Sequence, residues 1–223
     1  MVKGVIFDLD GTLIDTIEGL ANSVNAAMDF YNFPGHSIEE YRAFVGNGVG
    51  KLVERALPED KKHLKDDARK IFEKHYEETM LDILPVYDGI DELLSYLMEH
   101  DIKIAVNTNK MDVFAKPMIK KVFGDIFCCV LGEVEHFSRK PSPEGVNYIL
   151  EKMCLKNDEC LYIGDSQVDI QTAHNARMRS VSVAWGFATR EVIMANDPDI
   201  VVEEPREIID LIERENTYAG KYS

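Results

Sequence analysis

The chain alternates, along most of its length, between short apolar runs and segments whose apolar residues recur at helical spacing. Runs of three or four apolar residues are typical of buried strands. Asp88 to Glu99 instead carries Ile90, Leu93 and Leu97 on one helical face. Strands that alternate with helices form parallel sheets covered on both faces, so the sequence predicts a doubly wound α/β fold. The predicted strands are Val5–Phe7, Ile104–Val106, Cys128–Leu131, Cys160–Ile163, Val181–Val183 and Ile200–Val202, with further helices at Pro143–Met153 and Val168–Ala176.

One long stretch, from Thr16 to Leu84, breaks this alternation because it contains no strand pattern. Ser37, followed three residues later by Glu40, is typical of a capping box that opens a helix. We therefore predict a helical cap domain of residues 16–84, inserted into a core domain of residues 1–15 and 85–223. The other predicted cap helices are one that Asp15 or Thr16 caps and that runs to Tyr31, one at Val49–Leu57, and one at Pro58–Met80, where Pro58 suits a first helical turn.

Length and charge limit the classes of partner. The chain has 223 residues, enough for one domain with an insert, and its net charge is −15. An acidic surface argues against nucleic acid or an anionic membrane as the main partner. A small phosphorylated metabolite stays compatible, because a metal and a few local cations can reverse the field inside a cleft. The sequence leaves monomer and homodimer open.

The sequence also indicates a compartment. The N-terminus carries no pattern of a signal peptide, and the apolar runs are too short to span a bilayer. The four cysteines, Cys128, Cys129, Cys154 and Cys160, fit no metal or redox spacing. Each lies in or beside an apolar segment, so we expect buried, reduced thiols. These features predict a cytoplasmic protein.

Two acids follow the first predicted strand. The run Gly4–Phe7 leads into Asp8-Leu9-Asp10-Gly11-Thr12-Leu13. Side chains two residues apart on a strand point to the same side, so Asp8 and Asp10 are expected together at the strand tip. Such a pair can bind a hard cation, attack an electrophile or transfer a proton. Taken alone, the segment is also compatible with a strand end followed by polar turn residues.

Three further polar groups follow predicted strands or precede a predicted helix. Thr108 and Asn109 end the second strand, Lys140 lies between Arg139 and Pro141, and Asp165 follows Gly164 with Asp169 four residues later. Open parallel sheets bind ligands at the carboxyl ends of their strands. Each segment alone has an ordinary alternative, such as a solvated turn at Asn109-Lys110 or a helix cap at Asp165.

Together, these four segments resemble the four motifs of the haloacid dehalogenase (HAD) superfamily, in the same order. The resemblance implies that Asp8 attacks phosphorus to form an aspartyl-phosphate and that Asp10 is the general acid and base. It implies that Thr108 and Lys140 stabilise the transferring group, and that Asn109 helps to hold it. A helical cap inserted between the first and second motifs resembles the C1 type of HAD phosphatase.

The same resemblance implies a magnesium site. Its ligands are the Asp8 carboxylate, the Asp10 backbone carbonyl and the Asp165 carboxylate, with Asp169 supporting the metal from an adjacent position. Mg2+ suits this set because the donors are oxygens and no cluster of histidines or cysteines accompanies them.

A glycine-rich loop in the predicted cap has its own resemblance. Val45-Gly46-Asn47-Gly48, followed by Glu54-Arg55-Ala56-Leu57, resembles the cap signature of phosphoglycolate phosphatases. It implies a substrate-binding role for Gly46, Asn47, Gly48 and Lys51, because glycines let backbone amides approach an anion at a helix N-terminus. A turn between helices is the alternative.

The chain departs from its relatives at one position, where Ala176-Arg177-Met178 replaces their Ala-Gly. We expect Arg177 to disturb the helix end locally, away from the chemistry. The segment Trp185-Gly186-Phe187 is expected to form wall and packing.

The functional prediction is a Mg2+-dependent phosphatase acting on a small phosphomonoester such as 2-phosphoglycolate. A β-phosphoglucomutase shares both acids, and pyrophosphatase or nucleotidase activity also stays open. A dehalogenase is disfavoured because that branch lacks an acid matching Asp10. A catalytically silent regulatory protein is a further alternative, against which the complete set of motif residues argues.

Overall fold

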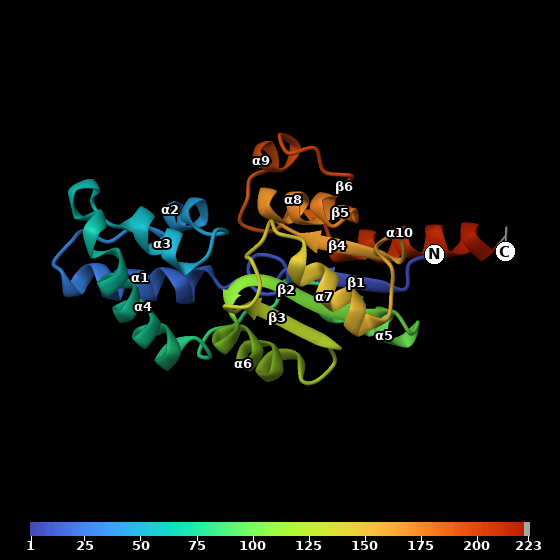
Figure 1. The fold of residues 1–223 in the computed structure, drawn as a ribbon, viewed down its shortest axis with the longest axis horizontal. Helices are drawn as coiled ribbons and strands as arrows, with labels where there is room; N and C mark the ends of the chain where they lie inside the picture. Colours follow the sequence, from blue (N-terminus) through green and yellow to red (C-terminus); the bar gives the residue numbers. More distant parts are fainter. Residues whose placement is uncertain (221–223) are drawn as a thin grey trace.

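A six-stranded parallel sheet forms the centre of the core, in a computed structural model that describes residues 1–220. The strand order is β3-β2-β1-β4-β5-β6, so the direction of winding reverses at β1. This arrangement confirms the doubly wound α/β prediction (Figure 1). The strands are β1 Gly4–Phe7, β2 Lys103–Met111, β3 Cys129–Glu133, β4 Cys160–Gly164, β5 Arg179–Val183 and β6 Ile200–Val202.

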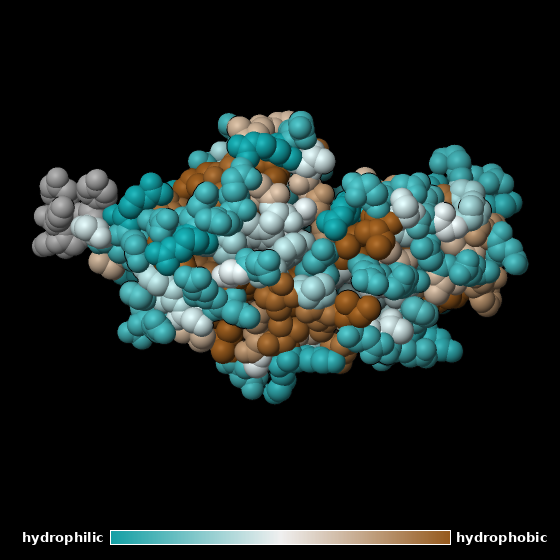
Figure 2. Space-filling model, turned by 180° about the vertical axis from the view of Figure 1, so that it is seen from behind, coloured by the Kyte–Doolittle hydropathy of each residue, from teal (hydrophilic) through white to brown (hydrophobic). Residues whose placement is uncertain are grey.

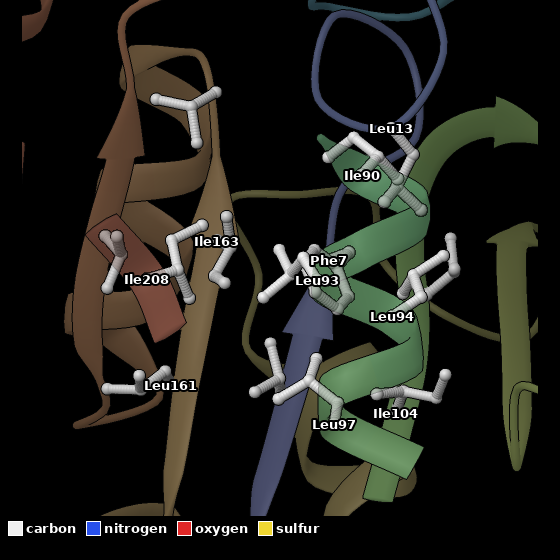
Figure 3. Close-up of a cluster of buried hydrophobic side chains, with 14 of the residues drawn as sticks. Phe7, Leu13, Ile90, Leu93, Leu94, Leu97, Ile104, Leu161, Ile163 and Ile208 are labelled. Carbon is white, nitrogen blue, oxygen red and sulfur yellow. The ribbon is translucent and has the colours of Figure 1, made fainter. Parts of the chain in front are cut away.

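Helices cover both faces of the sheet because its central strand is apolar on both sides. Val5 and Phe7 of β1 join one hydrophobic cluster, with α5, α6 and α10, whereas Ile6 joins another, with α7 and α8. Figure 3 shows α5 lying over β1 and β2, with Leu93 beside Phe7. The helices of the core are α5 Ile90–Glu99, α6 Asp112–Phe123, α7 Glu144–Met153, α8 Gln167–Asn175, α9 Arg190–Met194 and α10 Pro205–Gly220, with a short 3-10 helix η2 at Asn157–Glu159.

The helices of the insert pack around a hydrophobic cluster of their own, to which α6 adds Phe114 and Met118. They lie at the end of the molecule opposite the two termini (Figure 1). The predicted capping box is confirmed, since the Ser37 hydroxyl accepts from the Glu40 amide at 3.3 Å. The helices are α1 Ile17–Phe30, α2 Ile38–Phe44, α3 Val49–Ala56 and α4 Lys65–Thr79, with the 3-10 helix η1 at Glu59–Leu64. The domain boundaries at 15/16 and 84/85 stay a prediction.

Two predicted elements are corrected. The expected helix Pro58–Met80 is broken, because Pro58 precedes the 3-10 helix η1 and the α-helix begins only at Lys65. The second strand extends beyond its apolar run to Met111, with a register shift in its pairing to β3 after Asn107. Thr108, Asn109 and Lys110 are therefore buried strand residues and not a solvated turn.

The cysteine prediction is only partly correct. All four thiols are free, but Cys128 and Cys154 are exposed, and only Cys160 is buried. Apolar neighbours in sequence did not secure burial, because Cys128 precedes the edge strand β3 and Cys154 follows the last turn of α7.

The surface is mainly hydrophilic on the face seen from behind (Figure 2). Hydrophilic residues cover much of the surface seen from behind, with hydrophobic residues gathered over parts of the core and toward its junction with the helical insert (Figure 2). Among residues 1–220, no helix combines the length and apolarity that crossing a bilayer requires.

Arg177 does not disturb its helix end, contrary to expectation. It adopts φ +55°, the left-handed conformation that glycine usually supplies after a helix. The Met178 amide still donates to the Ala173 carbonyl at 2.8 Å, which closes the end of α8. An arginine in this conformation is less favourable than a glycine, but the chain follows the same path that a glycine would allow.

Candidate active site

A cleft of about 360 Å³ lies between the carboxyl ends of the core strands and the helical insert. Asp8, Asp10 and Thr108 line it from the core, and residues 45–49 line it from the insert. The sheet topology explains this placement, because β1, β2 and β4 are neighbours whose carboxyl ends meet at one edge. The structure thus brings together residues that are far apart in the sequence.

Lys140 joins two of the predicted acids. Its Nζ lies 2.9 Å from Asp8 Oδ1 and 2.7 Å from Asp169 Oδ1, and the Lys140 side chain is 4% exposed. Although burial by itself lowers the pKa of a lysine, the Asp169 and Asp8 carboxylates hold the pKa of Lys140 well above its ordinary value. Lys140 is therefore an ammonium that offsets negative charge beside Asp8.

The acids nevertheless outnumber the lysine. Asp8, Asp165 and Asp169 each offer a carboxylate oxygen within 4.8 Å of the others, and all three are buried. Burial raises the pKa of Asp8 to about 6, with Asp169 and Asp10 adding to the rise and Lys140 opposing it. Burial, together with the Asp169 and Asp8 carboxylates, raises the pKa of Asp165 well above its ordinary value. A cluster with excess negative charge is suited to a divalent cation.

Backbone contacts orient Asp165. Its Oδ2 accepts from the Phe187 amide at 2.7 Å, and a Cβ at Gly186 would lie 2.2 Å from the Asp165 Cβ. Trp185 Nε1 donates to the Thr12 carbonyl at 3.1 Å, which ties the same loop to the first motif. Phe187 lines the cleft and Trp185 packs against the core, as predicted for wall and packing, but the segment also positions Asp165, a role that the sequence did not indicate.

Both carboxylate oxygens of Asp169 are bound by other residues of the protein. Oδ1 pairs with Lys140, and Oδ2 accepts from the Ser166 amide at 3.1 Å and from the Ser166 hydroxyl at 2.6 Å. Ser166, and not Asp165, caps α8. Among the described residues, Asp165 accepts from the Phe187 amide and, at 3.4 Å, from the Thr12 hydroxyl, neither of which is charged. The roles of Asp165 as metal ligand and of Asp169 as its support stay a prediction.

Asn109 connects the second motif to the third. Its Oδ1 accepts from the Lys140 amide at 2.9 Å, and its Nδ2 donates to the Lys140 carbonyl at 3.2 Å. Nδ2 also lies 3.4 Å from the Gly46 carbonyl of the insert. The side chain thus positions Lys140 and touches the glycine loop, which leaves its backbone as the part able to meet a substrate.

Asp10 has a partner that the sequence analysis did not find. Lys110 Nζ lies 2.8 Å and 3.1 Å from the two carboxylate oxygens of Asp10, and the Thr16 hydroxyl donates to Asp10 Oδ1 at 2.6 Å. The Lys110 side chain is only 2% exposed. A solvated turn at Asn109-Lys110 is the alternative that this contact rules out, and the signal in the sequence for the role of Lys110 is its place in a polar run at a strand end.

The glycine loop of the insert adopts a conformation that needs glycine. Gly46 has φ +105° and Gly48 has φ +79°. Arg55 holds the loop from the following helix, donating to the Phe44 carbonyl at 2.7 Å and to Asn47 Oδ1 at 2.8 Å. Gly46, Asn47 and Gly48 line the cleft, as expected for substrate-binding residues.

Lys51 lies elsewhere. It is an exposed residue of α3 whose Nζ pairs with Glu54 at 3.1 Å, and it is absent from the cleft lining. The structure does not bring Lys51 to the cleft with the other predicted residues, and its contact with substrate stays a prediction.

Comparison with known proteins defines the class to which this fold and site belong. The family of haloacid dehalogenase-like hydrolases matches residues 5–183, so the chain belongs to that family. The family resemblance inferred from the four motifs is thereby confirmed.

Individual relatives carry names that specify an activity within this family. The chain is 32% identical over 219 residues to a phosphoglycolate phosphatase of Vibrio vulnificus (strain YJ016), covering 95% of this chain and 96% of that protein. It is also 32% identical to a phosphoglycolate phosphatase of Pectobacterium atrosepticum, covering 95% and 92%. A crystal structure of a predicted phosphoglycolate phosphatase from Haemophilus somnus 129pt is 29% identical, with a TM-score of 0.85 over 95% of this chain and 98% of that one.

Proposed function

We propose that this hydrolase is a Mg2+-dependent phosphatase that cleaves a small phosphomonoester, such as 2-phosphoglycolate, through an aspartyl-phosphate on Asp8. The observation that carries the proposal is the buried arrangement of Asp8 between Lys140 and Asp165 at the cleft floor. The names of the relatives support the choice of substrate.

The residues present fit a magnesium ion. The cluster offers only oxygen donors, and its carboxylates exceed its single buried ammonium. Asp8 and Asp165 would hold Mg2+ through their carboxylates and Asp10 through its backbone carbonyl, with Asp169 fixing Lys140 beside them. A bound Mg2+ would neutralise charge on the phosphoryl group and orient it.

The chain's own residues carry out the steps. A carboxylate oxygen of Asp8 attacks phosphorus in line, so that the Asp8–phosphorus bond forms while the bond from phosphorus to the leaving oxygen breaks. Asp10 gives its proton to the leaving oxygen. It then takes a proton from the water that attacks phosphorus and releases Asp8. Thr108 donates its hydroxyl to a phosphoryl oxygen, and Lys140 offsets charge on the same group.

Asp10 enters this scheme already held by two donors, Lys110 and Thr16. Its transfer of a proton requires the carboxyl group to turn from at least one of them toward the leaving oxygen. Thr16 directly precedes α1 and makes no capping bond with its side chain, so the residue that holds Asp10 also lies at the entry to the cap. The cap is proposed to exclude water and to contact the leaving group.

The test is a panel of phosphorylated metabolites ranked by kcat/KM, with Mg2+ and with EDTA. The panel contains 2-phosphoglycolate, pyrophosphate, nucleoside monophosphates and β-glucose 1-phosphate. We expect Mg2+-dependent release of phosphate, fastest from 2-phosphoglycolate. Conversion of β-glucose 1-phosphate to the 6-phosphate would favour the mutase, and absence of turnover on the whole panel would favour the silent regulatory protein.

A second test addresses the intermediate. Beryllium fluoride with Mg2+ mimics an aspartyl-phosphate, so it should inhibit the enzyme by binding at Asp8. A crystal structure or a 19F spectrum of the inhibited enzyme reports the position. Beryllium bound away from Asp8 would contradict the covalent mechanism.

A further inference from the structure

Three basic side chains line the cleft, and only one of them is buried. Arg55 is exposed and is occupied by the Phe44 carbonyl and Asn47. Arg42 is 30% exposed and lies 3.5 Å from Asp15. Lys110 is 2% exposed, and its ammonium meets Asp10 at the cleft floor. A buried charge interacts more strongly with a ligand than an exposed one, because less water screens it.

The ammonium of Lys110 has capacity for a second anion. A lysine carries three N–H donors, and the contacts at 2.8 Å and 3.1 Å with Asp10 use two of them. The face of the Tyr76 ring lies 5.0 Å from Nζ, and Phe114 packs edge-on to that ring. Both aromatic residues line the cleft. A ligand group that reached Lys110 would therefore meet a donor that Asp10 does not use, beside the Tyr76 side chain.

The place of Lys110 on β2 sets the size of such a ligand. Thr108, the proposed phosphoryl contact, lies two residues earlier on the same strand. The strand is irregular between Asn107 and Met111, but the Lys110 amide donates to Thr108 Oγ1 at 3.3 Å, and both residues line the cleft. A phosphoryl group and a carboxylate joined through one ester oxygen and one carbon are a few ångströms apart. The Thr108 and Lys110 side chains are long enough to contact the phosphoryl group and the carboxylate of one such ligand at the same time.

Among the charged residues near the proposed phosphoryl site, Lys110 is the one placed to bind an anionic leaving group. Lys140 is occupied by Asp8 and Asp169, beside the proposed phosphoryl site. The cleft also carries Glu39 in the insert, which would repel an anion placed far from the floor. An anionic leaving group is thus favoured only close to the phosphoryl group, next to Lys110.

We propose that Lys110 is the specificity-determining residue of the cleft, whose ammonium binds the carboxylate of a short leaving group. This inference rests on the proposed phosphatase function, which it deepens by naming the substrate class: a phosphomonoester with a carboxylate one carbon from the ester oxygen. Asp10 and the substrate carboxylate then share one cation.

The first test measures binding without turnover. In an Asp8→Asn background with saturating Mg2+, calorimetry compares 2-phosphoglycolate with 2-hydroxyethyl phosphate, which has a hydroxymethyl group in place of the carboxylate. We expect the carboxylate ligand to bind about 10- to 100-fold more tightly, the range for a hydrogen bond to a charged group. Lys110→Met in the same background should remove most of that preference, and Lys110→Arg should keep part of it.

The second test measures kcat/KM of the otherwise unchanged enzyme on the same two compounds. Lys110→Met should lose far more on 2-phosphoglycolate than on 2-hydroxyethyl phosphate, because the loss of the contact with Asp10 affects both equally. Lys120→Met, a 73% exposed lysine of α6, is the matched control and should change neither value.

The outcomes separate the two proposals. Equal losses on both substrates, or a carboxylate preference that survives Lys110→Met in the binding test, would overturn the role of Lys110 in specificity. No turnover of either compound by the wild-type enzyme would overturn the phosphatase proposal, while the binding test would still decide the role of Lys110. Thermal melting shows whether Lys110→Met folds, and the folded Lys110→Arg protein gives the comparison if it does not.

Discussion

The floor and the roof of the cleft are built differently. On the floor, core residues hold one another through short contacts, as where Lys140 bridges Asp8 and Asp169. On the roof, the insert presents a loop whose glycines take positive φ and whose polar groups are occupied mainly by Arg55 of the same helical segment. The floor is thus preorganised for one reaction, whereas the roof offers backbone and shape.

This difference suggests how one chemistry serves different substrates. Strand ends fix the direction of the floor side chains, so the geometry needed for phosphoryl transfer is carried by the sheet. A loop between two helices can change without disturbing that geometry. Lys110 crosses this division, because it belongs to the core yet contacts Tyr76 of the insert, as Asn109 does with Gly46. The predictions below test the division between floor and roof.

The largest effect is expected on the floor, at Asp8. Asp8→Asn replaces the proposed nucleophile by a neutral amide and should lower kcat by at least about 10³-fold, as for residues that act as a unit with their partners. Phosphate release from a purified variant measures it. Near-normal turnover would remove Asp8 from the mechanism.

A smaller loss is expected at Asp10. Asp10→Asn keeps the backbone carbonyl assigned to Mg2+ but removes the proton-transferring group, so kcat should fall by roughly 10²-fold with little change in Mg2+ affinity. An aryl phosphate with a good leaving group should lose less in the first step. A collapse of metal affinity with chemistry retained would instead make the Asp10 side chain a ligand.

On the roof, Gly48→Val should act on substrate choice. A Cβ at Gly48, whose φ is +79°, would lie 3.2 Å from an Arg139 nitrogen and would strain the loop. We expect kcat/KM for 2-phosphoglycolate to fall by about 10-fold, through lost leaving-group contacts, and a small aryl phosphate to be affected little.

Gly124→Val is the matched control for Gly48→Val. Gly124 has φ +71°, ends α6 away from the cleft and has nothing within 4 Å of an added Cβ. It should lower the melting temperature without changing the ratio of the two substrates. Equal losses on both substrates in folded Gly48→Val would show that the loop does not set specificity.

The charge excess of the floor predicts a pH effect on stability without metal. The folded pKa of Asp8, about 6, lies above its ordinary value of 3.8. Ionisation of the buried Asp8 carboxyl therefore lowers the free energy of unfolding. This destabilisation is absent below pH 3.8, grows between pH 3.8 and pH 6, and is complete above pH 6. In EDTA, Asp8→Asn should melt higher than the wild type at pH 7, and Lys140 keeps Asp169 as its partner.

The size and sign of that difference are both measurable. The gain at pH 7 should be at least about 2 °C, the shift that 1 kcal/mol produces in a chain of this length, and it should shrink as the pH falls toward 4.5. Saturating Mg2+ should reverse the order, because the wild type binds the metal better. A gain that does not depend on pH would rule out the Asp8 charge as its cause.

The smallest effect is expected far from the cleft. Arg177→Gly should stabilise the protein by about 1 kcal/mol, because glycine takes φ +55° without the cost that other residues carry, and activity should not change. Arg177→Ala, which keeps the strained backbone, is the control and should give no gain in a denaturant titration.

Local patterns in the sequence determined that a parallel sheet forms, the order of strands and helices along the chain, and the positions of Asp8 and Asp165 directly after their strands. They could do so because burial of a strand or a helix face needs a periodic apolar pattern that neighbours in sequence supply. The Ser37 capping box was predictable for the same reason, since both partners lie within one helical turn.

Only the tertiary structure decided which polar groups meet. Lys110 and Asp10 are 100 residues apart, and their contact depends on the extension of β2 to Met111 and on the cover that Tyr76 provides. Lys51 illustrates the converse, because its helix α3 turns it toward Glu54 and solvent. A sequence pattern shows that a residue is polar but not what it contacts. Burying its charge is unfavourable unless the tertiary packing brings an oppositely charged or hydrogen-bonding partner within about 3 Å.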